Sequence, residues 1–395
     1  MNIPHQPNES EIRLERFRRL MERQGVEIVV LVHPADIFYF AGIALFSTLI
    51  VPLEKEPILL VQLNHARGMQ ESWVKDVRPS FGISTVAQTL KELSPANVRV
   101  GTELDVMPVN NYRRFSQALP NIEFVDISPA LLQVRMIKSP SEINLMKNIA
   151  RVSALGFQQC QKVLRPGITE WELAKVIKDV EHYYHAERPL NLRAWDQVFE
   201  FGMIAAGDNS CEVSGYWLTA TGRGVSKARP YGPSSRPMQE GELVIINKGV
   251  NIQGYHVDQA RTFAVSEPTI EQQDQYEALK TIMEAAFKQV RPGAAAADIY
   301  TAARDKAADL GYEEYFMTRA LYDFEYIGHG VGIEMDEPPL IGPRSKVILE
   351  PGMVLALEPK LIIPGRGGLD LEDTLVVTES GAEWITYGSK ELYFK

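Results

Sequence analysis

One stretch, VIINKGVNIQGYHVDQARTF at residues 244–263, constrains the chain more than any other. It begins with three β-forming residues, Gly249 and Gly254 permit a tight turn, and a second extended segment follows. The pattern predicts a β-hairpin that carries Asn247 and Asp258 on neighbouring strands. Two short side chains with oxygen atoms, directed at one point, are the beginning of a metal site.

Three later stretches offer further ligand types. They are His329 in GHGVG, Glu358 in LALEPK and Glu372 in LDLEDT. Carboxylates and one imidazole suit a divalent ion. Taken singly, each residue is explained as a surface acid, a hairpin side chain or a core histidine. Taken together and in order, they favour a metal site.

These motifs resemble the signature of the pita-bread superfamily, which includes aminopeptidase P, prolidase, methionine aminopeptidase and their metal-free relative creatinase. The family pattern is Asp, Gly-Tyr-x-x-Asp-x-x-Arg-Thr-Phe, Gly-His-Gly, Glu-Pro and Glu-Asp. This chain carries GYHVDQARTF at 254–263, GHG at 328–330, EP at 358–359 and ED at 372–373. The resemblance covers nearly the whole chain, and it implies a pseudo-symmetric pita-bread domain around a central site.

Three positions depart from the family pattern. Asn247 stands where the peptidases have their first aspartate, and Tyr231 and Asp336 stand where they have two histidines. These departures keep a second interpretation open, in which the same scaffold carries different chemistry.

The resemblance implies a metal-ligand set of Asn247, Asp258, His329, Glu358 and Glu372. In the family, the residues matching Asp258 and Glu372 bridge two ions, and those matching His329 and Glu358 complete the shell of the second ion. The first ion would depend on Asn247, whose neutral amide is a poorer ligand than a carboxylate. We therefore expect one divalent ion in preference to two. Manganese is preferred over iron, cobalt or zinc, and a metal-free site is the alternative.

The catalytic residues expected from the resemblance are Glu358, Tyr231 and Asp336. Glu358 would serve as a ligand and a proton shuttle. The Tyr231 hydroxyl can donate a hydrogen bond, and so can replace one histidine. Asp336 would act as a base or bind a cationic group of the substrate.

Substrate contacts are expected from the irregular segment 193–236 and from the hairpin. The segment is rich in glycine, serine and arginine, and such loops often line pockets. Its candidates are Trp217, Arg223 and Arg229, and the alternative for each arginine is a solvated position. His256 is a fourth candidate because it has the strand parity of Asp258.

The chain has 395 residues, and its length and pattern predict two domains. Residues 1–134 alternate short strands and helices, as in a small α/β domain. The resemblance implies that this is an N-terminal domain of the creatinase/prolidase type. Residues 135–395 form the predicted pita-bread domain, of α+β class. Arg-Pro-Gly occurs at 165–167 and again at 291–293, each between two helical patterns, which suggests a duplicated unit.

Composition limits the partners and the compartment. The net charge is −10 without a dominant basic patch, which argues against nucleic-acid binding. Cys160 and Cys211 are the only cysteines, and no apolar run is long enough to span a bilayer, so we expect a cytoplasmic protein. The resemblance implies a homodimer acting on a small molecule or short peptide.

Three functions remain open from the sequence. The first is a metal-dependent hydrolase resembling Xaa-Pro aminopeptidase or dipeptidase, which cleaves an amide bond with metal-activated water. The second is a non-peptidase on this scaffold, such as a creatinase- or ectoine-hydrolase-like enzyme or a dimethylsulfoniopropionate-type lyase. The third is a binding protein without catalytic activity.

Overall fold

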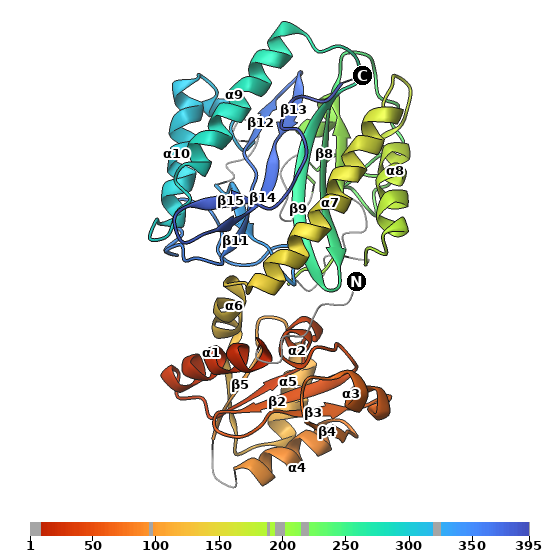
Figure 1. Ribbon diagram of the computed structural model, residues 1–395. Coiled ribbons are helices and arrows are strands. Elements are labelled where there is room, and N and C mark those ends of the chain that lie inside the picture. Colours follow the sequence, from red (N-terminus) through yellow and green to blue (C-terminus); the bar gives the residue numbers. More distant parts are fainter. Residues whose placement is uncertain are drawn as a thin grey trace. The chain divides into compact units, whose positions relative to one another are not determined.

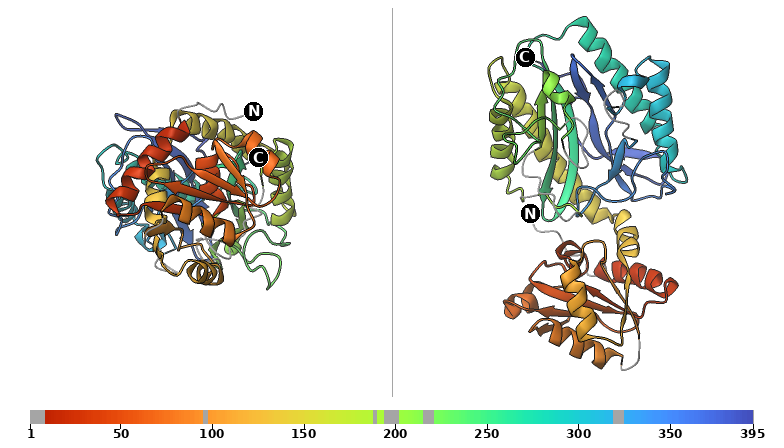
Figure 2. Two further views of the ribbon diagram at one scale, coloured as in Figure 1. Left: turned by 90° about the horizontal axis from the view of Figure 1, so that it is seen from below. Right: turned by 180° about the vertical axis from the view of Figure 1, so that it is seen from behind.

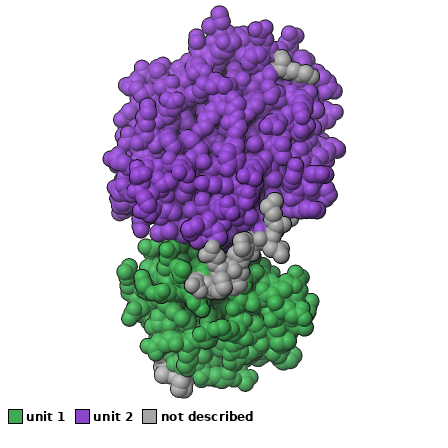
Figure 3. Space-filling view, viewed as in Figure 1, with its two compact units in different colours: residues 1–135, 193–196 green, residues 136–192, 197–395 purple. Residues whose placement is uncertain are grey.

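The computed structural model describes residues 9–94, 98–187, 190–193, 202–214, 221–318 and 325–394. Two compact units are present (Figure 3). The first comprises Met1–Arg135 with Arg193–Asp196, and the second comprises Met136–Leu192 with Gln197–Lys395. Among the helices described, none combines the length and the apolar character needed to cross a membrane.

The first unit is a six-stranded sheet in the order β4-β3-β2-β1-β5-β6, with helices packed around it (Figure 1). All neighbours are parallel except β2, which runs antiparallel to β1 and β3. The strands are β1 (Ile28–Leu31), β2 (Ser47–Pro52), β3 (Ile58–Val61), β4 (Asp76–Pro79), β5 (Arg99–Thr102) and β6 (Glu123–Asp126). The helices are α1 (Glu9–Arg23), α2 (Pro34–Ala41), α3 (His65–Glu71), α4 (Ile83–Leu93), α5 (Val109–Ala118) and α6 (Ser128–Met136).

A buried acid lies at the end of β5 in this unit. The Glu103 carboxylate is fully buried and accepts hydrogen bonds from the backbone N–H groups of Val32 and His33, each at 3.1 Å. Burial, together with the negative charge of Asp36, raises the pKa of Glu103 to about 7. Stability contributed by this group is therefore present at acidic pH and is lost as the pH rises through about 7.

We predict that Glu103→Gln stabilises the first unit at pH 8 relative to the wild type, by up to about 3 kcal/mol, because the amide never has to ionise in the buried site. Hydrogen exchange in peptides from β1 and β5 measures the effect, and comparing variant with wild type at the same pH removes the intrinsic pH dependence of exchange. The exposed Glu123→Gln is the control. Equal protection of Glu103→Gln and wild type at pH 8 would contradict the prediction.

The second unit contains a seven-stranded sheet in the order β10-β11-β14-β9-β8-β7, with β15 paired to β14, and a two-stranded sheet of β12 and β13. Its strands are β7 (Met203–Ala206), β8 (Leu243–Ile252), β9 (Tyr255–Ala264), β10 (Gly328–Gly330), β11 (Val354–Leu357), β12 (Lys360–Ile363), β13 (Gly367–Asp370), β14 (Glu372–Val377) and β15 (Ala382–Trp384). Its helices are α7 (Pro140–Val163), α8 (Glu170–Tyr183), α9 (Ile270–Phe287) and α10 (Ala296–Asp309), with 3-10 turns η1 (Gly207–Cys211) and η2 (Glu313–Tyr315).

Helix pairs cover the two halves of this sheet, as both ribbon views show (Figures 1 and 2). One apolar core joins α7 and α8 to β7 and β8, and another joins α9 and α10 to β11, β12, β13 and β14. Helix α7 begins with a capping box of Ser139 and Glu142, and α8 begins with one of Thr169 and Glu172. Local sequence thus sets where the covering helices start.

The two halves repeat one arrangement, as the paired Arg-Pro-Gly motifs suggest. Each motif ends a helix with a glycine at positive φ, and that glycine's N–H donates to a carbonyl group just before a strand. The bonds are Gly167 N to Met238 O at 2.8 Å and Gly293 N to Leu349 O at 2.9 Å. Each half then contributes three neighbouring antiparallel strands, β7-β8-β9 and β10-β11-β14.

The predicted hairpin is β8 and β9, but its turn is shorter than predicted from the sequence. It consists of Gln253 and Gly254, both at positive φ, which suits a two-residue hairpin loop. Gly249 lies inside β8, directly opposite Asp258, so its assignment to the turn was wrong. A Cβ atom at Gly249 would lie 2.6 Å from Met335 Sδ, so the glycine is needed for close packing over the strand.

Candidate metal centre

Alternation along β8 and β9 determines which side chains meet. Val244 and Ile246 of β8 face the core under α7 and α8, while Ile245 packs against Ile362 on the other side of the sheet. Since side chains alternate along a strand, Asn247 has the orientation of Ile245. Asp258 lies opposite Gly249 and therefore points to the same side. The hairpin thus brings both residues to one face, as the sequence predicted.

A row of residues crosses three strands at the centre of this face. Ala260 on β9 pairs with Asn247 on one side and with Glu372 of β14 on the other. Because the alanine side chain is small, the Asn247 amide reaches across it, and Nδ2 donates to Glu372 Oε2 at 2.9 Å. Nδ2 also lies 3.2 Å from Asp370 Oδ2. Asn247 therefore presents N–H donors to two carboxylates.

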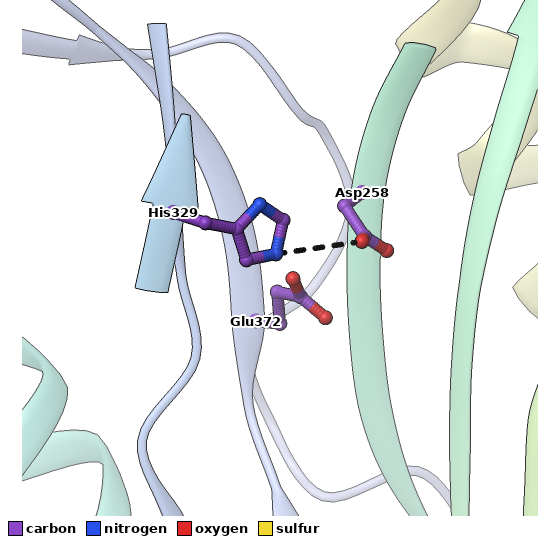
Figure 4. Close-up of side chains that lie close together, drawn as sticks. All are labelled: Asp258, His329 and Glu372. Carbon is purple, nitrogen blue, oxygen red and sulfur yellow. Dashed lines mark ion pairs between the residues drawn. The ribbon is translucent and has the colours of Figure 1, made fainter. Parts of the chain in front are cut away.

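Asp258, His329 and Glu372 converge beside this row (Figure 4). All three are buried, and each offers a ligand atom within 4.8 Å of the others. The His329 Nδ1–H donates to Gly330 O at 3.0 Å, which leaves Nε2 directed at Asp258 Oδ2, 3.9 Å away. This hydrogen bond fixes the ring orientation that a metal ligand requires.

The glycines of Gly-His-Gly allow β10 to approach its neighbours closely. A Cβ atom at Gly328 would collide with the carbonyl oxygen of Ala356, and one at Gly330 would collide with that of Pro338. The two glycines therefore allow the close backbone packing that positions His329 in the site.

A buried ion pair fixes the backbone beneath Glu372. Arg261 Nη2 lies 2.8 Å from Asp373 Oδ1, and Arg261 Nη1 donates to the Glu372 carbonyl oxygen at 2.7 Å. Arg261 and Asp373, which the motifs contain beside the ligands, therefore act as a clamp between β9 and β14.

Glu358 and Asp336 complete the surroundings of the His329 ring. Nε2 lies 3.5 Å from Asp336 Oδ1 and 3.7 Å from Glu358 Oε1. Burial disfavours the charged ring, but the neighbouring carboxylates outweigh this and raise the pKa of His329 to about 9. Burial, strengthened by neighbouring acids, raises the pKa of Asp258 to about 7 and that of Glu372 well above its usual range.

Lys360 and Asp370 also belong to this cluster, and neither was predicted from the sequence. They are directly opposite each other in the β12–β13 pair, with Lys360 Nζ 3.6 Å from Asp370 Oδ2. The ammonium group also bonds Glu358 Oε2. Burial disfavours the ammonium ion, but the carboxylates raise the pKa of Lys360 above its ordinary value. A signal for both was present in the sequence, because Lys360 lies two positions after Glu358 and Asp370 lies two positions before Glu372.

The remaining predicted site residues lie in other surroundings. Both ring nitrogens of the buried His256 contact the backbone, with Nδ1 3.1 Å from Gly332 O and Nε2 accepting from Asn191 N at 3.2 Å. Arg223 is exposed and pairs with Glu212.

Tyr231 packs beside the buried cluster of Leu190, Met203 and Met335, and the half-buried Arg229 lies over its ring, with Cζ 5.7 Å from the centroid. Met203 is opposite Asn247, and Met335 precedes Asp336, so Tyr231 lies among the neighbours of the site. Trp217 lies outside the described residues.

The donor set fits a divalent ion. Two carboxylates and one imidazole are suitable ligand types for it. The buried Glu372 Oε1 has no hydrogen-bond partner among the described residues, and a cation would satisfy it.

Comparisons with known proteins agree with this geometry. Residues 144–379 match the model of metallopeptidase family M24, and residues 13–137 match the creatinase/prolidase N-terminal domain. The chain belongs to metallopeptidase family M24. It is 27% identical over 390 residues to the Xaa-Pro dipeptidase of Lactobacillus delbrueckii subsp. lactis, covering 96% of this chain and 98% of that one.

Two solved structures show the same fold. A prolidase from Pyrococcus furiosus is 25% identical with a TM-score of 0.77, covering 94% of this chain and 99% of that chain. An Xaa-Pro dipeptidase from Bacillus anthracis is 24% identical with a TM-score of 0.84, covering 98% of this chain and 100% of the other.

These matches confirm the predicted resemblance and the two-domain α/β and α+β fold class. They also confirm the prediction of a metal-dependent hydrolase of the peptidase type, and they do not favour a non-peptidase on the same scaffold.

We predict that ion binding at this site weakens as the pH falls. In the ion-free site, His329 holds its proton up to a pKa of about 9 and Asp258 up to about 7, so an ion must displace protons. Apparent affinity for Mn²⁺ should therefore rise between pH 6 and pH 9, with release of at least roughly one proton per ion at pH 7.5, because the raised pKa of Glu372 adds to the protons displaced. Calorimetry in two buffers of different ionisation enthalpy measures the release.

His65→Gln in the first unit is the control and should leave proton release unchanged. An affinity that does not vary with pH would contradict the prediction.

Proposed function

We propose that this protein is a metal-dependent peptidase that cleaves short peptides with proline after the scissile bond, as an Xaa-Pro dipeptidase or aminopeptidase. The observation that carries the proposal is the convergence of Asp258, His329 and Glu372 within 4.8 Å, inside a chain of metallopeptidase family M24. The relatives named Xaa-Pro dipeptidase, matched over nearly their whole length, support the substrate class.

In this proposal, one divalent ion is held by Asp258, His329, Glu358 and Glu372. Manganese is preferred, with iron, cobalt or zinc as alternatives. When bound, the ion would act as a Lewis acid that activates water and polarises the scissile carbonyl group.

The chain's own residues supply the proton transfers. Glu358 Oε1 lies on the His329 side of the cluster, while its other oxygen is bonded by Lys360. Lys360 and His329 overcome the effect of burial and keep the pKa of Glu358 below its usual range, so Glu358 is ionised and able to accept a proton. Tyr231 lies at the edge of the same region and would donate a hydrogen bond to the substrate carbonyl group.

The first experiment is elemental analysis of protein purified without added metal, followed by titration with Mn, Fe, Co and Zn. Cleavage of Xaa-Pro dipeptides and tripeptides is measured in the same samples. We expect about one ion per chain and cleavage that chelation abolishes. Bound metal without peptide cleavage, or cleavage that survives chelation, would favour the non-peptidase interpretation.

Glu358→Gln should lower kcat by roughly 10²–10⁴-fold, because the amide cannot take up a proton. Glu350→Gln, at an exposed position of the same unit, is the matched control and should keep wild-type turnover.

Asp336→Asn tests the second acid beside His329. If Asp336 is a base, the variant should lose turnover by roughly 10²-fold or more. If the carboxylate instead binds a cationic group of the substrate, KM should rise with little change in kcat. Kinetics over a series of Xaa-Pro substrates with free and blocked amino groups distinguish the two roles. Unchanged kcat and KM would reject both.

We further propose a cytoplasmic homodimer. Two free cysteines without a disulfide are consistent with a reducing compartment. The resemblance to dimeric pita-bread peptidases supports the assembly state, which sedimentation analysis would test.

A further inference from the structure

The two glutamates of the site each have one oxygen bonded to a nitrogen donor. Glu372 Oε2 accepts from Asn247 Nδ2, and Glu358 Oε2 accepts from Lys360 Nζ. Their other oxygens remain available. Glu358 Oε1 lies 3.7 Å from His329 Nε2, and Glu372 Oε1 has no hydrogen bond within the part of the chain that the structure describes. The cluster therefore has one side occupied by N–H groups and one side open to a cation.

Asp370 connects the two nitrogen donors. Its Oδ2 atom lies 3.6 Å from Lys360 Nζ and 3.2 Å from Asn247 Nδ2. Both partners of the Lys360–Asp370 pair have almost fully buried side chains, 3% and 0% exposed. Lys360, Asp370, Asn247 and Glu372 thus form a continuous chain of alternating donors and acceptors, in which Asn247 is half-buried and the other three are buried.

A metal ion cannot share this position with the donors. An amide ligates a cation through its oxygen, whereas Asn247 directs its N–H group at the carboxylates. An ammonium group repels a second cation and has no acceptor atom to offer it. Two carboxylate oxygens on this side, Glu372 Oε2 and Asp370 Oδ2, already accept from these donors, whereas Asp370 Oδ1 has no hydrogen-bond partner among the described residues.

The internal repeat shows how the arrangement arises. Aligning the turn glycines Gly241 and Gly352, which precede β8 and β11, places Asn247 against Glu358 and Gly249 against Lys360. Equivalent positions therefore hold a neutral residue with a glycine in one half and an acid with a lysine in the other.

We propose that Asn247 and Lys360 together take the place of a second metal ion, so that the centre is built for a single ion. Charge balance supports this substitution. An aspartate with a divalent ion carries a net charge of +1, and an asparagine with a lysine carries the same charge. The inference rests on the proposed function in one respect, which is that the centre binds one divalent ion.

The test is to remove the Lys360 ammonium group, restore a carboxylate at position 247, and ask whether a second metal ion then binds. The double variant Asn247→Asp/Lys360→Met removes one positive charge and adds one negative charge, and it should bind one more ion than the wild type. Both proteins are loaded with excess Mn²⁺ and desalted, and ions per chain are counted by elemental analysis. Electron paramagnetic resonance should show isolated Mn²⁺ in the wild type and exchange-coupled Mn²⁺ in the double variant.

Lys248→Met is the matched control. Lys248 is also a buried lysine, next to Asn247 in sequence, but it faces the other side of the sheet, where it bonds Ser153 and lies 4.7 Å above the Phe157 ring. Removing its charge should leave the ion count unchanged.

A gain of one ion in the double variant alone supports the inference. Two ions in the wild type would overturn it, and this measurement does not require the variant to fold. No gain in a double variant with wild-type circular dichroism would also overturn it. Failure of the proposed function would appear separately, as absence of Xaa-Pro cleavage with the ion counts unaffected.

Discussion

Repulsion among buried carboxylates is the constraint on which the catalytic unit depends. Asp258, Glu358, Asp370 and Glu372 lie in one small, largely water-excluded region, and taking such charges out of water costs several kcal/mol per ion unless they are compensated. The cluster is compensated on one side by Lys360 and an amide, and on the other by an imidazole together with the divalent ion that metallopeptidase family M24 implies.

The sheet meets this constraint by placing small residues between the large ones. Ala260 separates Asn247 from Glu372, Gly249 lies opposite Asp258, and Ala356 lies opposite His329. At Gly249 even a Cβ atom would lie 2.6 Å from Met335 Sδ, so this position has no room for a larger side chain. The register of the strands, more than any single contact, therefore determines the shape of the site.

Local features of the fold were predictable from the sequence because their causes are local. The capping boxes of α7 and α8 and the β8–β9 hairpin each depend on residues a few positions apart. The ordered motifs also identified the residues that converge at Asp258, His329 and Glu372. What the sequence could not show was the direction of the Asn247 amide, because that depends on Asp370, more than a hundred residues away. The contact of Lys360 with Asp370 was missed for a similar reason, since it forms only when β12 pairs with β13.

The seam between the two repeated halves is short. The ladder between strands β9 and β14 has two residue pairs, Glu372 with Ala260 and Asp373 with Gln259, and the Thr374 hydroxyl also bonds the Asp258 backbone. Asp258 lies on one side of this seam, and His329 and Glu372 lie on the other. An ion bound by all three would therefore connect the two halves. Its binding free energy would then add to the resistance of the domain to splitting along that line. In such a protein, metal supply would control the stability of the domain as well as its catalytic activity.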